Sequence, residues 1–331
     1  MDKYSPQLAF RYFNFEFFTN LSKALKPQVI MITGANTGLG KDAARQFALL
    51  SNTKKVYLAC RNLSKAEKAK EELEKVTQRD IFEVFHFNPA QLSSIQQAVG
   101  GLTGPIDVLI MNAGGFGGKR PGELTPQGVT HQFEANVTGH AKLAEALVEA
   151  GKLKQTAVYV SSEVARGVKS LQAPAPELKS HSVEEIQSIA TGRYFDQWDP
   201  MTAYGHTKYI GTLWMYAFAR KYPELKCLTI TPGSTKGTEA VEDFPAPMRF
   251  MFKYIMMPLV MPLRGMVHSL ETGAKRYVDV AVQDRYKSGK FYGSEKEKIT
   301  GKLVEQEPFL PSLQKLEYQE NAYQAVQSYI G

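Results

Sequence analysis

The chain has 331 residues, of which 43% are hydrophobic and 22% are charged. This balance is typical of a globular protein and excludes a disordered or fibrous chain, and the length suits one α/β domain with terminal additions. The formal net charge of +7 favours an anionic ligand, an acidic membrane surface or nucleic acid as a partner.

Short apolar runs alternate with amphipathic stretches along most of the chain, which predicts strands separated by helices. The predicted strands span residues 28–33, 55–60, 81–87, 107–112, 156–161 and 226–231. The predicted helices span residues 41–51, 64–78 with Ser64 as N-cap, 93–99, 125–151, 203–222 and 312–330. Strands joined through helices form right-handed βαβ units, so we expect an α/β fold with a doubly wound parallel sheet and helices on both faces.

Several segments lie outside this alternation. Residues 1–26 crowd aromatic side chains ahead of the first strand and form an N-terminal extension. Residues 163–201 are a polar insertion, and residues 244–265 are rich in Met, Phe and Pro. A loop of about forty residues within a compact domain is usually functional or flexible. We therefore predict one domain over residues 27–300, followed by a helical tail at 301–331.

A glycine-rich turn, TGANTGLG at residues 33–40, lies between the first strand and its helix. Glycines permit a tight turn and a close approach to a pyrophosphate, which then faces the unpaired N–H groups of the helix. The alternative is a flexible turn that needs glycine for positive φ alone. The GxxxGxG spacing resembles the short-chain dehydrogenase/reductase family. This resemblance implies a Rossmann fold and a dinucleotide held at Gly34, Asn36, Thr37, Gly38, Leu39 and Gly40.

The residues after the second strand bear on the choice of cofactor. The strand ends in Ala59-Cys60-Arg61-Asn62, without the carboxylate that an NAD site usually places there to hold the ribose 2′-OH. The Arg61 guanidinium suits a 2′-phosphate instead, because its planar fork binds phosphate oxygens in pairs. We therefore predict NADP(H), with a solvated loop residue as the alternative interpretation of Arg61.

Further family motifs lie at the ends of later strands. Met111 stands where many relatives have a second Asn, Asn88 where they have Asp, and Gly237 where they have Ser or Thr. Thr235 or Thr238 is the expected replacement for that last hydroxyl. By resemblance, the cofactor also contacts Asn88, Asn112, Ala113, Gly114, Pro232 and Gly233.

Tyr204 and Lys208 form the strongest catalytic signal. Side chains four residues apart on a helix lie on one face, and a nearby cation lowers the pKa of a phenol, whose reference value is about 10. An isolated match of this kind is usually a surface tyrosine and a solvated lysine. Here the pair opens the helix after the fifth strand, where the family has it.

Two more positions complete the family's catalytic set. By resemblance, Ser162 at the end of the fifth strand polarises the substrate carbonyl, and Asn136 holds a water on Lys208 that completes a proton relay. The insertion at 163–201 must loop out for Ser162 to meet Tyr204. Similar insertions, with a Phe-Asp pair like that at 195–196, occur in the retinol-dehydrogenase-like and protochlorophyllide-reductase-like branches.

These features predict an NADP(H)-dependent oxidoreductase that transfers a hydride between the nicotinamide and an apolar carbonyl or alcohol, such as a ketone, an aldehyde or a retinoid-, steroid- or lipid-like molecule. Tyr204 is the expected proton donor. The segment at 244–265 is the expected substrate lid, because Met adapts to irregular apolar ligands, with core packing as the alternative. The rival functions are a C=C reductase of the protochlorophyllide-reductase type and a non-catalytic NADP-binding regulator.

The remaining expectations concern partners and location. Two cysteines without a Cys/His cluster predict neither a disulfide framework nor a metal site. They favour a reducing cytoplasm, as does the lack of a recognisable signal peptide or membrane-spanning run. Nucleic acid is not expected, because Arg61 and Lys208 account for part of the positive charge. Peripheral membrane contact and homo-oligomer formation stay open.

Overall fold

The computed structural model describes residues 25–118, 120–169, 173–236, 261 and 265–331. The predicted N-terminal extension at 1–26 and the predicted lid at 244–265 therefore lie almost wholly outside the described residues. Among the helices that are described, none combines the length and apolar character needed to cross a bilayer.

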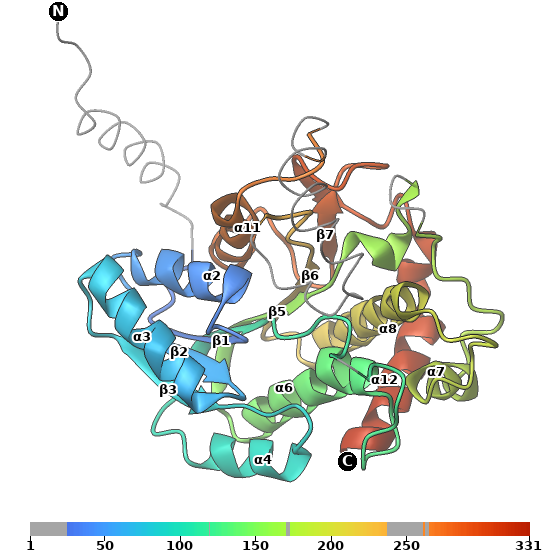
Figure 1. Cartoon of the computed structure of the whole chain (residues 1–331), viewed down its shortest axis with the longest axis horizontal. Coiled ribbons are helices and arrows are strands. Elements are labelled where there is room, and N and C mark those ends of the chain that lie inside the picture. The colour runs from blue at the N-terminus through green and yellow to red at the C-terminus, as the bar shows by residue number, and fades with distance from the viewer. Residues whose placement is uncertain (1–24, 119, 170–172, 237–260, 262–264) are drawn as a thin grey trace, which may run out of the picture.

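An eight-stranded sheet runs through the described residues in the order β3-β2-β1-β4-β5-β6-β7-β8 (Figure 1). Strands β1 to β7 pair in parallel, and β8 is antiparallel to β7. The predicted α/β Rossmann class is confirmed. The strands are β1 (Val29–Thr33), β2 (Lys55–Cys60), β3 (Phe82–His86), β4 (Ile106–Met111), β5 (Leu153–Val160), β6 (Lys226–Ile230), β7 (Phe291–Ser294) and β8 (Leu303–Glu305).

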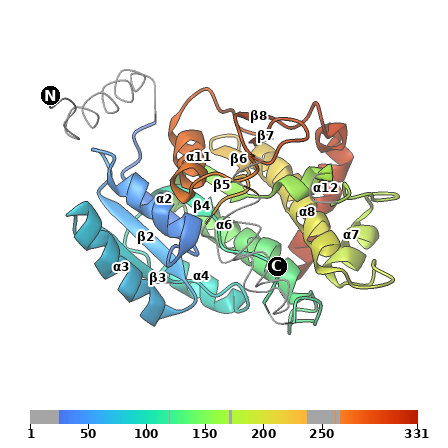
Figure 2. The same cartoon turned by 45° about the horizontal axis from the view of Figure 1, so that its top comes forward.

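Helices cover both faces of this sheet (Figure 2). Because side chains alternate along a strand, Ile30 and Ile32 of β1 pack into one apolar core while Met31 packs into the other. The first core includes α2 (Gly38–Ala48), α3 (Leu63–Thr77) and α11 (Leu270–Val282). The second includes α4 (Leu92–Gly100), α6 (Gly139–Glu149), α7 (Val183–Ala190), α8 (Pro200–Lys221) and α12 (Leu316–Ile330).

The six predicted strands are confirmed, with ends that shift by up to three residues. The sequence does not predict β7 and β8, because runs of four and three residues are too short to show a period. One predicted cap is wrong. Asn62, rather than Ser64, caps α3, because its Oδ1 accepts a hydrogen bond from the N–H of Lys65 at 2.9 Å.

The helix predicted over 125–151 begins six residues late. Residues before it form a tight loop in which Gly128 has a φ of 79°, and helical hydrogen bonding starts only at α5 (His131–Phe133). The Thr130 hydroxyl caps α5 by accepting from the Phe133 N–H at 3.2 Å. A π-helical turn, η2 (Glu134–Thr138), then joins α5 to α6.

The predicted insertion at 163–201 contains a short 3-10 helix, η3 (Glu163–Arg166), and α7. After α7 the chain enters α8 at Pro200, the first residue of that helix. The Asp199 carboxylate caps the helix by accepting from the Thr202 N–H at 2.7 Å. This start lies three residues before the predicted one.

The helix predicted in the C-terminal tail over 312–330 is present as α12, and it begins at Leu316. It packs beside α8 and α7 (Figure 1). The carboxylate of Glu145 in α6 fixes α12 in place, since it accepts from the Tyr323 hydroxyl at 2.7 Å and from the Gln327 amide at 2.9 Å.

Candidate active site

The glycine-rich turn connects the end of β1 to the start of α2. Gly34 and Gly38 have φ values of 65° and 53°, a region that favours glycine. A Cβ on Gly40 would lie 2.5 Å from the Gly34 carbonyl oxygen and 2.6 Å from Asn112 Nδ2. The first turn of α2 contains no acidic residue, so its positive dipole end is not offset by a carboxylate there and suits an anionic group. The other predicted contacts of this turn, Asn36, Thr37 and Leu39, lie between these glycines.

The motif at the end of β4 lies against the same turn. Asn112 Nδ2 donates to the Thr33 carbonyl at 2.9 Å, and the Ala113 N–H donates to the Thr33 hydroxyl at 2.8 Å. Tyr277 of α11 donates to Asn112 Oδ1 at 3.1 Å. Asn112, Ala113 and Gly114 therefore border the glycine-rich turn, as the resemblance implies.

Arg61 and Asn88 follow the ends of two neighbouring strands. Arg61 comes directly after β2 and is exposed, and the N–H of Gly34 bonds the carbonyl of Ala59, near the end of that strand, at 2.8 Å. Asn88 follows β3, and its Oδ1 accepts from the Ala90 N–H at 3.2 Å. Both residues thus lie at the edge of the sheet that carries the glycine-rich turn.

The predicted catalytic side chains meet between β5 and α8. The segment that follows Ser162 contacts α8, and the Ser162 hydroxyl lies close enough to the Tyr204 phenol to lower its pKa, so the insertion does loop out. The ammonium of Lys208 lies 5.6 Å from the centre of the Tyr204 ring and donates to the Val160 carbonyl at 2.8 Å. Ser161 faces the helix backbone instead, because its hydroxyl donates to the Lys208 carbonyl at 3.2 Å.

Asn136 lies beside this group, in the π-helical turn. Its side chain bonds Gly115 twice, from the Gly115 N–H to Oδ1 at 3.1 Å and from Nδ2 to the Gly115 carbonyl at 2.8 Å. A Cβ on Gly114 would overlap Asn136 Oδ1 and lie 3.6 Å from Lys208 Nζ, so Gly114 separates the two side chains. The Asn136 carbonyl already accepts from the hydroxyl of Tyr159 at 3.1 Å, so a relay water would have to share it.

Burial dominates the electrostatics of Tyr204 and Lys208. It raises the pKa of Tyr204 well above the ordinary value, and the charge of Glu163 raises it further, while the Ser162 hydrogen bond lowers it. Burial also lowers the pKa of Lys208 to about 7. The net effect on Tyr204 is opposite to the lowering that the sequence predicts, because burial disfavours the charged forms of both groups.

An apolar wall surrounds the Tyr204 side chain. The ring of Phe116 lies 4.8 Å from that of Tyr204, centre to centre. Beside it is a cluster of buried side chains against which Tyr204 packs: Val164, Val168, Ala173, Met261 and Ile299. The surroundings of the phenol therefore suit an apolar ligand better than a charged one.

The turn after β6 carries Pro232 and Gly233, whose φ is 75°. The imidazole of His268 bonds the Pro232 carbonyl at 2.7 Å and the Thr235 hydroxyl at 3.1 Å. Thr235 also donates to the Gly233 carbonyl at 3.0 Å, so it lies at the predicted turn, whereas 237 and 238 lie outside the described residues.

Two charged residues near this turn are not predicted from the sequence. Glu163 and Arg276 are both 5% exposed and lie 3.7 Å apart. A carboxylate directly after Ser162 and an arginine on the buried side of an amphipathic helix are the signals that point to them.

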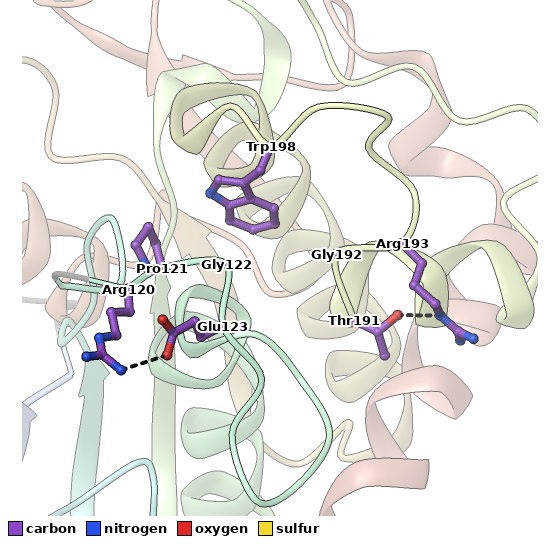
Figure 3. Close-up of a pocket in the computed structure, with 8 residues that line it drawn as sticks. All are labelled: Arg120, Pro121, Gly122, Glu123, Thr191, Gly192, Arg193 and Trp198. Atoms are coloured by element: carbon purple, nitrogen blue, oxygen red, sulfur yellow. Dashed lines mark hydrogen bonds and ion pairs between the residues drawn. The ribbon is translucent and has the colours of Figure 1, made fainter.

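A separate open pocket, of about 420 Å³, lies between the loop at 120–123 and the segment at 191–198. Figure 3 shows the Trp198 indole beside its opening and the Arg120 guanidinium paired with the Glu123 carboxylate, 3.2 Å apart. None of the predicted site residues lines this pocket, so it is distinct from the group around Tyr204.

Comparison with known proteins agrees with this geometry. The family model for short chain dehydrogenases matches residues 28–175. The WW domain-containing oxidoreductase of Gallus gallus is 30% identical over 202 residues, which are 60% of this chain and 46% of the relative. Human retinol dehydrogenase 12 is 28% identical over 200 residues, which are 60% of this chain and 57% of the relative. The matches thus span about half of these relatives.

Solved structures show the same fold. Salutaridine reductase from Papaver somniferum superimposes with a TM-score of 0.56 at 20% identity, over 81% of this chain and 100% of that one. L-sorbose reductase from Gluconobacter frateurii, complexed with NADPH and L-sorbose, gives 0.58 at 16% identity, over 85% and 99%.

The described residues thus form a Rossmann-type fold, which these solved reductase structures share. Residues 28–175, somewhat less than half of the chain, match the family model for short chain dehydrogenases, and the chain is similar to human retinol dehydrogenases 12 and 13.

Proposed function

We propose that the protein is an NADP(H)-dependent reductase of apolar aldehydes and ketones, which in the opposite direction oxidises the alcohols. The observation that carries this proposal is that Ser162 and Lys208 both lie beside the Tyr204 phenol, at the same edge of the sheet as the glycine-rich turn. Bound NADPH would supply the hydride from the nicotinamide. The domain over residues 27–300 would carry all of these parts.

Each side chain has a distinct task in this proposal. The Ser162 hydroxyl donates a hydrogen bond to the substrate carbonyl oxygen, and Tyr204 gives that oxygen its proton. The raised pKa of Tyr204 keeps this proton on the phenol at neutral pH. Lys208, when charged, stabilises the phenolate that remains and orients the nicotinamide ribose. The Asn136 side chain holds the backbone at Gly115, beside Lys208. Its carbonyl, which already accepts from Tyr159, would also accept a hydrogen bond from the relay water.

The dinucleotide would lie along the edge of the sheet, from β3 to the turn after β6. Its pyrophosphate would lie at the glycine-rich turn before α2, where Gly40 packs so tightly against Gly34 and Asn112 that no side chain fits. The remaining contacts are proposed for Asn36, Thr37, Leu39, Asn88, Asn112, Ala113, Gly114, Pro232 and Gly233, with Tyr204 and Lys208 at the nicotinamide end.

The preference for NADP(H) rests on Arg61, an exposed guanidinium directly after β2 without a neighbouring carboxylate. We expect Arg61→Ala to weaken NADPH binding by roughly tenfold or more, while NADH binding changes little, since only NADPH has the 2′-phosphate. Fluorescence titration with both nucleotides measures this. Lys54→Ala removes one exposed positive charge at the opposite end of β2 and is the control. Equal losses for the two nucleotides would contradict the assignment.

The proposed substrate class follows from the apolar wall around Tyr204, and the resemblance to retinol dehydrogenases supports it. The test is NADPH consumption with a panel of long-chain and polycyclic aldehydes and ketones, beside matched enones, with product analysis. We expect alcohols as products. Saturated carbonyl compounds from the enones would favour the C=C reductase, and binding of NADPH without turnover on either panel would favour the regulator.

A further inference from the structure

Glu163 and Arg276 form a buried ion pair that the reaction proposed above does not use. Glu163 begins η3 and follows Ser162 directly, while Arg276 comes from α11 on the far side of the turn after β6. Each is only 5% exposed, and Arg276 Nη1 lies 3.7 Å from Glu163 Oε1. A buried pair of this kind is costly to desolvate, so its contacts indicate what it does.

The Glu163 carboxylate accepts hydrogen bonds from two hydroxyl groups, one after the end of β6 and one at the end of β7. The Thr231 hydroxyl donates to Glu163 Oε1, and the Ser294 hydroxyl, at the end of β7, donates to the same oxygen at 3.0 Å. Thr231 directly precedes the Pro232–Gly233 turn. The residue after the proposed carbonyl-polarising serine is thus fixed to the proposed nicotinamide-side turn.

Arg276 also contacts the Pro232–Gly233 turn and the residue before it. Its Nη1 donates to the Thr231 carbonyl at 3.1 Å, and its Nη2 donates to the Gly301 carbonyl at 2.7 Å. A Cβ on Gly233 would lie 2.8 Å from Arg276 Nη1, so the guanidinium packs directly against the glycine. Movement of either partner would move the turn.

We propose that Glu163 and Arg276 are positioning residues of the active site, which join the segment carrying Ser162 to the Pro232–Gly233 turn and hold a compensated negative charge beside Tyr204. This inference rests on the proposed function, because it assigns the pair to the same site. It adds two residues that touch neither substrate nor cofactor and act through Ser162 and Tyr204.

The charges of Glu163 and Arg276 predict the direction in which the removal of each residue shifts the pKa of Tyr204. After burial, Glu163 is the largest influence that raises the pKa of Tyr204. Removing Glu163 alone takes away that influence, while removing Arg276 alone leaves the carboxylate uncompensated. The two changes should therefore move the pKa of Tyr204 in opposite directions. Among the described residues, the other titratable groups that face this cluster are Tyr159, Arg166, Lys208, His268, Tyr277 and Tyr286.

The experiment compares Glu163→Gln, Arg276→Met and the double variant with the wild-type protein. The readout is the alkaline limb of kcat against pH for carbonyl reduction with NADPH, taken at its higher-pH step, where Tyr204 loses its proton after Lys208 has lost its own. We expect this limb to move to lower pH in Glu163→Gln and to higher pH in Arg276→Met, by roughly half a pH unit or more. The double variant should return close to wild type, since a buried pair replaced as a whole is often tolerated.

The proposal would be overturned if the alkaline limb of the kcat–pH profile stayed in place, or moved in the same direction in both single variants. Glu163 and Arg276 would then have a structural role only. Thermal unfolding at each pH identifies a variant that fails to fold, and the direction of the shift in the other single variant, against wild type, then decides the proposal. If the wild-type protein reduces no carbonyl, the proposed function fails. The phenolate absorbance of Tyr204, taken as the difference from the matching Tyr204→Phe protein, then tests the same two shifts without turnover.

Discussion

Asn136 is held by Tyr159 and by His140, and His140 in turn is bonded to a residue far away in the sequence. Its carbonyl accepts from the Tyr159 hydroxyl at 3.1 Å and bonds Nδ1 of His140 at 3.2 Å. The other ring nitrogen of His140 bonds the Thr33 hydroxyl at 2.9 Å, at the end of β1. Since a carbonyl only accepts, Nδ1 carries the proton and the Thr33 hydroxyl donates to Nε2. The neutral imidazole therefore joins the glycine-rich turn to the π-helical turn.

This buried imidazole makes stability depend on pH. Burial, and to a smaller extent the charge of Lys208, lowers the pKa of His140 to about 3, against about 6.5 in an unfolded chain. Between those values the unfolded state binds the additional proton. The contribution of His140 to stability is thus complete above about pH 6.5 and falls by ~1.4 kcal/mol per unit as the pH drops toward 3.

We expect His140→Gln to make the acid side of the stability curve shallower by the equivalent of about one proton. Glutamine keeps a donor and an acceptor but does not titrate. The measurement is the free energy of unfolding from urea curves between neutral pH and pH 4, for both proteins. Parallel curves would show that the imidazole is not the titrating group.

For single residues, the sequence predicts which side chains lie on one helix face better than it predicts which distant side chains are in contact. The pairing of Tyr204 with Lys208 is predicted from their separation along one helix, and Ser162 is predicted from the resemblance to the family. Glu163 and His140 do not follow, because their partners Ser294 and Thr33 lie 131 and 107 positions away.

At the scale of elements, α8 lies unusually close to β5. A Cβ on Gly211 in the middle of α8 would overlap the Tyr159 hydroxyl and lie 2.5 Å from Cζ of the same ring. Glycine here permits the approach that also brings Lys208 to the end of β5. Alanine normally stabilises a helix interior by about 1 kcal/mol relative to glycine, but here it has no space.

We therefore expect Gly211→Ala to destabilise the protein by about 1–3 kcal/mol, despite the gain in helix propensity. Gly100→Ala in α4 is the matched control, because a Cβ there would have no neighbour within 4 Å. Urea unfolding of both variants measures the difference. Equal effects would mean that α8 and β5 can separate without cost.

The six longer strands are predicted well because most of them contain a buried apolar run, whereas β7 and β8 are too short to show one. Helix starts are predicted less well, because they depend on which nearby polar residue captures a backbone N–H. Asn62 takes this role from Ser64, and Thr130 takes it at a position where the periodic pattern already appears helical.

At the scale of the whole molecule, the sheet order reverses between β1 and β4. A crevice opens at such a point, and ligands of open α/β sheets bind there. The glycine-rich turn follows β1 and the Asn112–Gly114 motif follows β4, so both flank it, with Ser162 after the next strand. The apolar pattern predicts a parallel sheet but not this order, which depends on the face that each helix covers.

The measurement that tests the account most directly is the turnover of Tyr204→Phe with NADPH and an apolar carbonyl that the wild-type protein reduces. Phenylalanine keeps the ring beside Phe116 but removes the proton donor. We predict that kcat falls by at least ~10²-fold while the Kd for NADPH, from fluorescence titration, stays within ~3-fold. A variant that binds NADPH and keeps its turnover would contradict the central claim.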